Sequence, residues 1–346
     1  MTILRVGLCP ELTAPVVEKL RAAGIKTVLD YLSSERESVA EQTGLAYSDV
    51  IRVRRSLQAI YATKVRTGNE LYEQLLKSTA IFSTGSSNVD NAIGGGIYTG
   101  RITEIVGASN SGKTQLCHSL VANVAVTSHF GVLYVDTLCC FSPERLRQVI
   151  AASRKAGGDY VRTETAALAK IRHVVVCDLL EVVQVVDQVR DTLSSKKGGS
   201  SSLLDVKLLV IDSLTAAASP ILTGGQYIDG LSLLSHLCIT LQHLAAKFRI
   251  AVVVTNDFVA GEAGLMKPAM GKHWEDVPSL SLELRLLGDI FDAGETREMK
   301  VVKSSNCSAL GRTVLFKIAA KGITTAGVTS RCVASSTAAA AASFNQ

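Results

Sequence analysis

The residues with the clearest chemical signature form one short run. They are Gly107, Ala108, Ser109, Asn110, Ser111, Gly112, Lys113 and Thr114, which together read G-x-x-x-x-G-K-T. The two glycines let successive backbone N–H groups turn toward an anion. A lysine at this spacing reaches the β- and γ-phosphates, and the threonine hydroxyl can bind Mg²⁺. The run therefore predicts a site for nucleotide phosphates and Mg²⁺.

The flanking residues predict the elements that must position this loop. Residues 101–106 alternate in polarity and suit a strand, whereas residues 115–125 have helical spacing without Pro or Gly. A second apolar run, 206–212, ends in Asp212. A buried parallel strand would deliver this carboxylate to the edge of a sheet, where it can hold the hydration shell of Mg²⁺. Many buried strands end in Asp, so the prediction depends on its pairing with the loop.

The remaining patterns predict an α/β protein. Strand-like runs at 131–136, 173–178 and 250–256 alternate with helical runs, which favours a mainly parallel sheet covered on both faces. Further runs near 280–287, 298–303 and 312–318 suit antiparallel strands that close the sheet. We expect four segments: a helical, helix-hairpin-helix-like domain over 1–60, a polar linker over 61–80, the α/β core over 81–323 and a disordered tail over 324–346.

Residues 1–60 show helical apolar spacing in several short segments. Ser33 or Ser34 followed by Glu37 suggests a capping box before one of these helices. The last helix carries Arg52, Arg54 and Arg55 opposite its apolar face. Such a basic face either meets nucleic-acid phosphates or is a solvated surface, and the sequence favours neither interpretation.

Composition restricts the function classes only weakly. The chain has 346 residues, a formal net charge of +5 and 47% apolar residues, values that permit nucleic-acid binding without requiring it. Its 8 cysteines form no C-x-x-C pair, which predicts buried thiols in a reducing compartment. No signal peptide or membrane-spanning run is recognisable, so an intracellular protein is expected.

Several short motifs together resemble the RecA-like recombinases of eukaryotes and archaea. They are Ser83–Gly85, Asp90, Gly95–Ile97, Thr99–Gly100, Ile102–Glu104, Gly112–Gln115, Val135–Thr137, Pro143–Leu146 and Val253–Asn256. Within that family, Leu4–Pro10, Ile25–Val28 and Lys267–Trp274 are most similar to the accessory recombinase paralogues of the D type. The resemblance spans nearly the whole chain short of the tail.

This resemblance implies a RecA-like P-loop ATPase core with a twisted, mainly parallel sheet behind a small all-helical domain. ATP would be held by Gly107 to Thr114, and Mg²⁺ by Thr114 and Asp212. Arg145 would stack on adenine, unless it is an ordinary surface arginine of a helix. The loop Gly261–Lys272 would meet DNA, whereas Trp274 is more typical of packing than of base stacking.

The same resemblance implies a nuclear protein of homologous recombination repair. It would bind single-stranded or branched DNA and work in a heteromer with other recombinase paralogues, assisting the main recombinase.

Three departures from the family pattern bear on activity. Leu138 occupies the position of the glutamate that polarises the attacking water, and Asp257 replaces a glutamine that senses the γ-phosphate. The linker also lacks the phenylalanine-x-x-alanine plug that docks on a neighbour. We therefore expect a weak DNA-dependent ATPase, because a water-positioning group typically contributes about 10²–10⁴-fold.

Three other functions remain as alternatives. A self-assembling, active strand-exchange recombinase would show robust DNA-stimulated hydrolysis, against which Leu138 argues. A small-molecule P-loop kinase usually carries an arginine-bearing lid, and Gly261–Lys272 contains no Arg. A pure interaction scaffold would not bind nucleotide, which Lys113, Thr114 and Asp212 contradict.

Overall fold

The computed structural model describes residues 3–61, 66–152, 160–195, 203–225, 227–260, 266–287, 296–305 and 308–326. Its internal contacts divide the chain into two compact units, Met1–Leu75 and Leu76–Gln346. This division falls inside the stretch expected as a linker. The exact bounds of the four predicted segments stay predictions. The expected tail over 324–346 lies outside the described residues from 327 onward, whereas Thr324 and Thr325 are not part of a disordered tail but the last residues of strand β13 (Gly322–Thr325).

The first unit is helical, which confirms the expectation for this end of the chain. Its helices are α1 (Ala14–Ala22), α2 (Val28–Ser33), α3 (Arg36–Thr43) and α4 (Tyr47–Tyr61), while α5 (Gly68–Ser78) crosses the division between the units. Apolar residues of the first four helices pack into one buried cluster, which includes Leu20 and Leu57. The helix α5 lies in the stretch that was expected to be a polar linker.

Helix capping in the first unit differs from the prediction. The N-cap of α3 is Glu35, and it makes no side-chain cap bond, so the capping box expected at Ser33 or Ser34 is wrong. The box lies before α2, where Asp30 N donates to Thr27 Oγ1 at 3.1 Å and Thr27 N donates to Asp30 Oδ2 at 2.8 Å. Ser34 Oγ instead donates to the Asp30 carbonyl at the end of α2, at 2.6 Å.

Arg52 and Arg54 of the basic face are bound within the first unit. The Arg54 guanidinium donates to the carbonyl of Ser34 at 3.0 Å and also to that of Leu32. It thereby satisfies carbonyl groups that the end of α2 leaves without helical partners. Arg52 pairs with Asp49 on the same helix. Contact of this face with nucleic acid stays a prediction.

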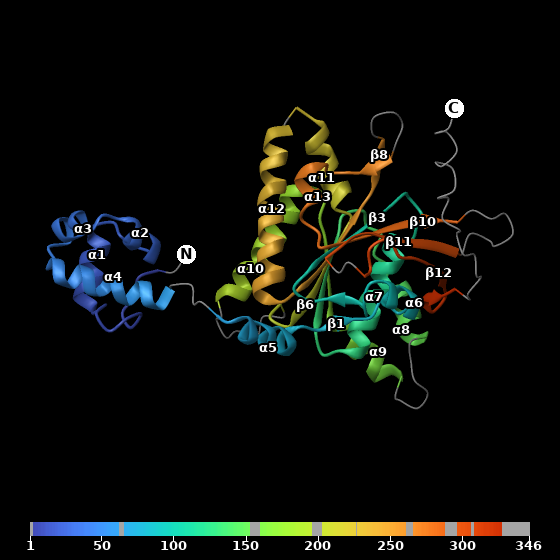
Figure 1. The fold of residues 1–346 in the computed structure, drawn as a ribbon, viewed down its shortest axis with the longest axis horizontal. Coiled ribbons are helices and arrows are strands. Elements are labelled where there is room, and N and C mark those ends of the chain that lie inside the picture. The colour runs from blue at the N-terminus through green and yellow to red at the C-terminus, as the bar shows by residue number, and fades with distance from the viewer. Residues whose placement is uncertain are drawn as a thin grey trace, which may run out of the picture. The chain divides into compact units, whose positions relative to one another are not determined.

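The second unit is built on a nine-stranded sheet of order β13-β12-β11-β10-β3-β7-β6-β4-β5 (Figure 1). Its strands are β3 (Ile102–Gly107), β4 (Gly131–Asp136), β5 (Ile171–Val175), β6 (Val206–Asp212), β7 (Ala251–Asn256), β10 (Leu280–Leu286), β11 (Thr296–Ser304), β12 (Thr313–Ala319) and β13 (Gly322–Thr325). Strands β10, β3, β7, β6, β4 and β5 run parallel, and the other three are antiparallel. The expected mainly parallel sheet is confirmed.

Two strands differ in detail from their sequence patterns. β10 was expected to be antiparallel, but it pairs in parallel with β3 and antiparallel only with β11. A crossover from β7 through α13 (Lys272–Glu275) returns the chain to the same end of the sheet, and such a connection produces parallel pairing. β5 begins and ends earlier than the expected run 173–178.

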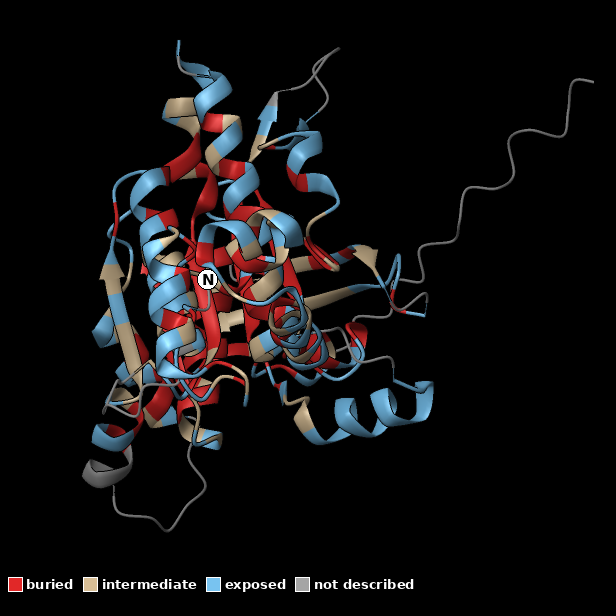
Figure 2. Ribbon diagram, turned by 90° about the vertical axis from the view of Figure 1, so that its left-hand side faces the viewer, coloured by how far each residue is buried: buried red, intermediate tan, exposed pale blue. Residues whose placement is uncertain are grey.

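Helices cover both faces of this sheet. They are α6 (Ser87–Ala92), α7 (Lys113–Thr127), α8 (Pro143–Ala152), α9 (Tyr160–Leu168), α10 (Leu179–Ser195), α11 (Leu214–Thr223) and α12 (Tyr227–Phe248). Val132 and Tyr134 of β4 join the cluster under α7 and α8, while Leu133 and Val135 join the cluster under α10, α11 and α12. This alternation follows from the two-residue period of a strand. The strands β3, β4 and β7 are accordingly buried along their whole length (Figure 2).

Two further pairs of short strands lie outside the nine-stranded sheet. β1 (Ile81–Phe82) pairs with β2 (Ile97–Tyr98) before the loop. After β7, β8 (Phe258–Ala260) pairs with β9 (Met266–Pro268). The first part of the expected DNA-contacting loop, residues 261–265, lies outside the described residues.

Candidate nucleotide-binding site

The predicted phosphate-binding loop connects the carboxyl end of β3 to the first turn of α7. A Cβ atom added to Gly107 would lie 2.7 Å from the carbonyl oxygen of Leu284 on β10 and would also collide with Ser111 Oγ. Gly112 is the N-cap of α7 and has a φ of +101°, which favours glycine. The loop therefore requires glycine at both positions, at the first for space and at the second for backbone conformation.

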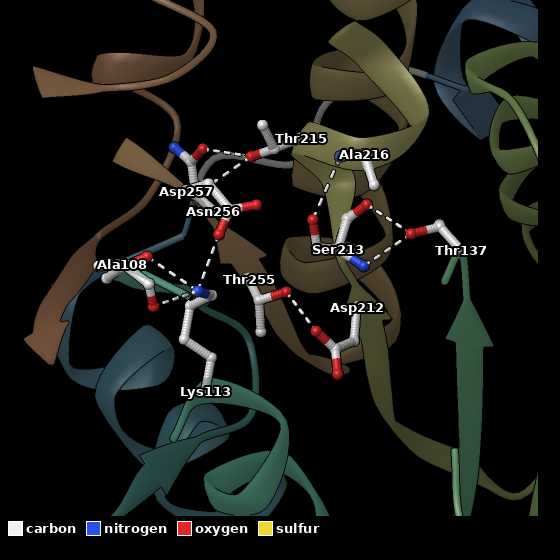
Figure 3. A network of polar contacts seen from close by, with 11 residues as sticks. Ala108, Lys113, Thr137, Asp212, Ser213, Thr215, Ala216, Thr255, Asn256 and Asp257 are labelled. Carbon is white, nitrogen blue, oxygen red and sulfur yellow. Dashed lines mark hydrogen bonds and ion pairs between the residues drawn. The ribbon is translucent and has the colours of Figure 1, made fainter. Parts of the chain in front are cut away.

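Lys113 is nearly buried, and its ammonium group has three acceptors. Nζ donates to the carbonyl of Gly107 at 2.8 Å and to that of Ala108 at 3.0 Å. It also forms an ion pair with Asp257 Oδ1 at 2.8 Å. Figure 3 shows Lys113 beside Ala108 and Asp257, the latter directly after β7. The lysine thus joins the loop to the neighbouring strand of the sheet.

The loop has the donors that a polyphosphate requires. The N-cap of α7 makes no side-chain bond, and the first turn of a helix leaves backbone N–H groups without intrahelical partners. Among the described residues, the buried Ser111 Oγ has no hydrogen-bond partner. Together with the Lys113 ammonium, these groups fit nucleotide phosphates.

Asp212 lies at the carboxyl end of β6, between β4 and β7. Its Oδ2 accepts from the hydroxyl of Tyr134 at 2.6 Å, and its Oδ1 accepts from Thr255 Oγ1 at 2.5 Å. A carboxylate has about four lone-pair sites, so these two bonds leave acceptor capacity for the hydration shell of Mg²⁺. The neighbouring strands supplied Tyr134 and Thr255, which sequence reasoning missed because nothing in their local pattern reveals the strand order.

Position 138 carries an exposed leucine on the turn after β4. Leu138 is 53% exposed, and its neighbour Thr137 donates its backbone N–H to the Asp212 carbonyl at 3.0 Å. Ser213 N in turn donates to Thr137 Oγ1 at 2.8 Å. These bonds attach the turn to the strand end that carries Asp212. An apolar side chain at this place cannot orient or deprotonate water.

Asp136 fixes the shape of that turn. Its Oδ1 accepts from the N–H groups of Leu138 and Cys140, and its Oδ2 from those of Phe141 and the ring of His173. Burial raises the pKa of Asp136, but these hydrogen bonds outweigh it and hold the pKa below its ordinary value. The carboxylate is therefore a structural anion and not a proton-transfer group.

Arg145 on α8 is bound by its neighbours. Its Nε donates to Gln115 Oε1 at 2.8 Å, and its terminal nitrogens donate to the carbonyls of Ala319 and Ala320 at 2.6 and 2.8 Å. Burial lowers the pKa of the guanidinium. These bonds connect α8 with α7 and with the turn between β12 and β13. Stacking on adenine stays a prediction.

Trp274 packs in the core, in agreement with the packing role expected from the sequence. It is 1% exposed, and its Nε1 donates to Glu104 Oε1 on β3 at 2.7 Å. The same oxygen accepts from Asn256 Nδ2 at 2.7 Å, and Glu104 Oε2 accepts from Ser281 Oγ at 2.9 Å. The buried carboxylate of Glu104 thus joins β3, β7, β10 and α13.

The described residues offer no other obvious site for this chemistry. No group of three or more His, Cys, Asp and Glu side chains among them is arranged to hold a metal ion. Within the same part of the chain, no helix combines the length and the apolarity that crossing a bilayer requires.

A phosphate-binding loop between β3 and α7, beside an acidic strand end in a mainly parallel sheet, defines a P-loop nucleotide-binding domain. The Rad51 family profile matches residues 76–326, and the profile described as "RAD51D, N-terminal domain" matches residues 1–59. The chain therefore belongs to the Rad51 family. The predicted similarity to the D-type paralogues is confirmed.

Individual relatives agree with this assignment. The chain is 37% identical over 305 residues to "DNA repair protein RAD51 homolog 4" of Bos taurus, covering 88% of this chain and 91% of that protein. It is 38% identical over 297 residues to the protein of the same name from Mus musculus, covering 86% and 87%. It is 29% identical over 321 residues to "DNA repair protein RAD51 homolog B" of Zea mays, covering 89% and 88%.

Proposed function

We propose that this protein is an ATP-binding component of DNA repair by homologous recombination. It acts in the nucleus within a heteromer of recombinase paralogues, binds single-stranded or branched DNA, and assists the main recombinase. Membership of the Rad51 family and similarity to relatives named as DNA repair proteins support a role in DNA repair by homologous recombination. The single observation that carries nucleotide binding is the strand–loop–helix cradle with Lys113 at its centre.

In this proposal the cradle from Gly107 to Thr114 holds the phosphates of ATP, and Thr114 and Asp212 hold Mg²⁺. A bound Mg²⁺ would neutralise phosphate charge. The protein's own part is to present backbone N–H groups and the Lys113 ammonium to the phosphates, and to orient the Asp212 carboxylate through Tyr134 and Thr255.

ATP serves mainly as a bound ligand that favours assembly, and hydrolysis is slow. The support is Leu138, an exposed leucine on a turn attached to Asp212. Without a group to position water at this place, about 10²–10⁴-fold of rate is lost. The lack of a phenylalanine-x-x-alanine plug in the linker also favours partners of a different sequence over self-assembled filaments.

The test is nucleotide-dependent assembly with co-expressed paralogues. Lys113→Ala should weaken ATP binding at least about tenfold, because it removes a charged donor, and should reduce recovery of the heteromer on size exclusion in ATP and Mg²⁺. Lys247→Ala, on the exposed surface of α12, is the matched control and should behave as wild type. Unchanged ATP binding and assembly in Lys113→Ala would refute the proposal.

A further inference from the structure

The ammonium of Lys113 has no donor to spare. A protonated lysine has three N–H donors, and Nζ is within hydrogen-bond distance of Gly107 O, Ala108 O and Asp257 Oδ1. A phosphate oxygen can therefore obtain a direct bond from Lys113 only when one of these acceptors leaves. This requirement comes from the contacts that Lys113 makes within the chain, so it is the same for any incoming anion.

Asp257 is the acceptor that is free to leave. The two carbonyl groups belong to the backbone of the loop itself, whereas the Asp257 carboxylate lies at the end of a side chain that is 38% exposed. The backbone of Asp257 is held on both sides: its N–H donates to Thr215 Oγ1 at 3.0 Å, and its carbonyl accepts from Ala269 N at 2.9 Å. The carboxylate can thus turn away toward solvent while the backbone keeps its bonds.

Electrostatic repulsion from an incoming phosphate also favours departure of the Asp257 carboxylate from Lys113. Phosphates that approach Lys113 bring negative charge close to the Asp257 carboxylate, and like charges at short range disfavour each other. Lysine donates as a point charge without the fixed bidentate geometry of arginine, so the ammonium can exchange one anion for another. The carboxylate and the phosphate therefore compete for one cation.

We propose that Asp257 sets the phosphate affinity of the cradle as an internal competitor for Lys113, and that nucleotide binding is transmitted to the segment after β7 by its displacement. The inference rests on the function proposed above, that this cradle binds nucleotide. It assigns Asp257 a specificity-determining role: the residue penalises nucleotides whose β- and γ-phosphates need Lys113.

The packing next to Asp257 provides a built-in reporter. Asn256, the preceding residue, donates to the same Glu104 oxygen as Trp274 Nε1. Trp274 is the single tryptophan of the chain. Displacement of the Asp257 carboxylate changes the electric field next to this hydrogen-bonded cluster, so the emission of Trp274 should change when ATP binds.

The experiment compares wild type, Asp257→Asn and Asp229→Asn in the full-length chain with Mg²⁺. Titration calorimetry measures the affinity for ATP, ADP and AMP, and Trp274 emission is recorded in the same titrations. Asp229 lies exposed in the first turn of α12, so its variant matches the change in net charge away from the cradle. Asp257→Ser is a second variant that removes the carboxylate, and circular dichroism checks that all variants fold.

We expect Asp257→Asn and Asp257→Ser to bind ATP up to about fivefold tighter than wild type, because a partly exposed ion pair contributes at most about 1 kcal/mol. AMP affinity should not change, because Lys113 serves the β- and γ-phosphates. The ATP-dependent change in Trp274 emission should be smaller in both variants than in wild type or Asp229→Asn, since no ion pair remains to be displaced.

The outcomes separate this inference from the proposed function. If wild type binds ATP and the Asp257 variants bind it no tighter, the competition is refuted and the nucleotide site stands. An equal gain for AMP, or an equal gain in Asp229→Asn, would also refute it, because a general charge effect would then be the cause. If none of the proteins binds ATP, the proposed function and the inference both fail.

Discussion

At the scale of single residues, the structure shows how the same residue type takes different roles by its contacts. Asp136 accepts backbone N–H groups and shapes a turn, whereas Asp212 accepts two hydroxyl groups and keeps acceptor capacity at the edge of the sheet. Asp257 pairs with Lys113. All three follow or end neighbouring parallel strands, so only their partners distinguish them.

The buried side chain of His118 should affect how the free energy of unfolding depends on pH. It is 1% exposed on α7, where it packs against the rings of Tyr134 and Phe141, and neither ring nitrogen has a hydrogen-bond partner among the described residues. Burial lowers the pKa of His118 below its ordinary value of 6.5, and Arg145 adds to this, while Asp212 and Asp136 oppose it.

This lowered pKa predicts a loss of stability in mild acid. When the pH falls below 6.5, the unfolded chain binds a proton at this residue and the folded chain does not, so the free energy of unfolding decreases. His118→Phe cannot bind this proton, so the variant lacks this pH-dependent loss of the free energy of unfolding. The stability of the variant relative to wild type should therefore rise between about pH 7.5 and about pH 5.5 in urea denaturation.

His118→Gln is the control for ring size, because it also cannot titrate and should show the same change in pH dependence. Equal pH profiles for wild type and both variants would contradict the prediction.

At the scale of elements, the loop depends on strand β10 although β10 contributes no part of the motif. A Cβ atom added to Gly107 would lie only 2.7 Å from the carbonyl oxygen of Leu284 on β10. β10 and β3 pair in parallel with Leu284 opposite Gly107. The close approach of these two backbones is what makes the first glycine of the motif necessary here.

Gly107→Ala should therefore damage both packing and binding. The added methyl group must push against backbone and Ser111, which costs about 1–3 kcal/mol of stability, and it should weaken ATP binding at least about tenfold by displacing the loop. Thermal unfolding and calorimetric titration measure the two effects.

Gly225→Ala is a matched control in the same unit, since a Cβ atom there meets nothing within 4 Å. If Gly107→Ala had no larger effect than this control, the steric account of the loop would be wrong.

At the scale of the whole molecule, the chain consists of two compact units with separate hydrophobic cores. The cradle and all of its described partners belong to Leu76–Gln346. The first unit contributes a helical domain whose sequence matches the D-type profile. Its basic residues are in part bound to their own unit through Arg54.

Because ligands stabilise the unit that binds them, ATP with Mg²⁺ should protect only the second unit. At about 100 times the dissociation constant the stabilisation is about 2.7 kcal/mol. Amide hydrogen exchange with peptide resolution should show slowed exchange in buried strands β3 and β6 and no change in α1 to α4. Lys113→Ala should abolish the protection, and protection confined to the first unit would contradict the prediction.

The sequence by itself determined the strand–loop–helix around Lys113, the acidic end of β6, the helical first unit and the family. Each of these is encoded by residues close together in the chain, through periodicity, glycine positions and local motifs. It also revealed Leu138 and Asp257 as departures from the family pattern, but not what these residues contact.

Only the tertiary structure determines which residues and strands contact one another. Asp257 pairs with Lys113, Glu104 binds Trp274, and β10 runs parallel to β3. The partners are far apart in sequence, and the order of strands in the sheet brings them together. Local patterns determine which elements form, whereas the pairing of strands and the packing of their helices determine which side chains meet.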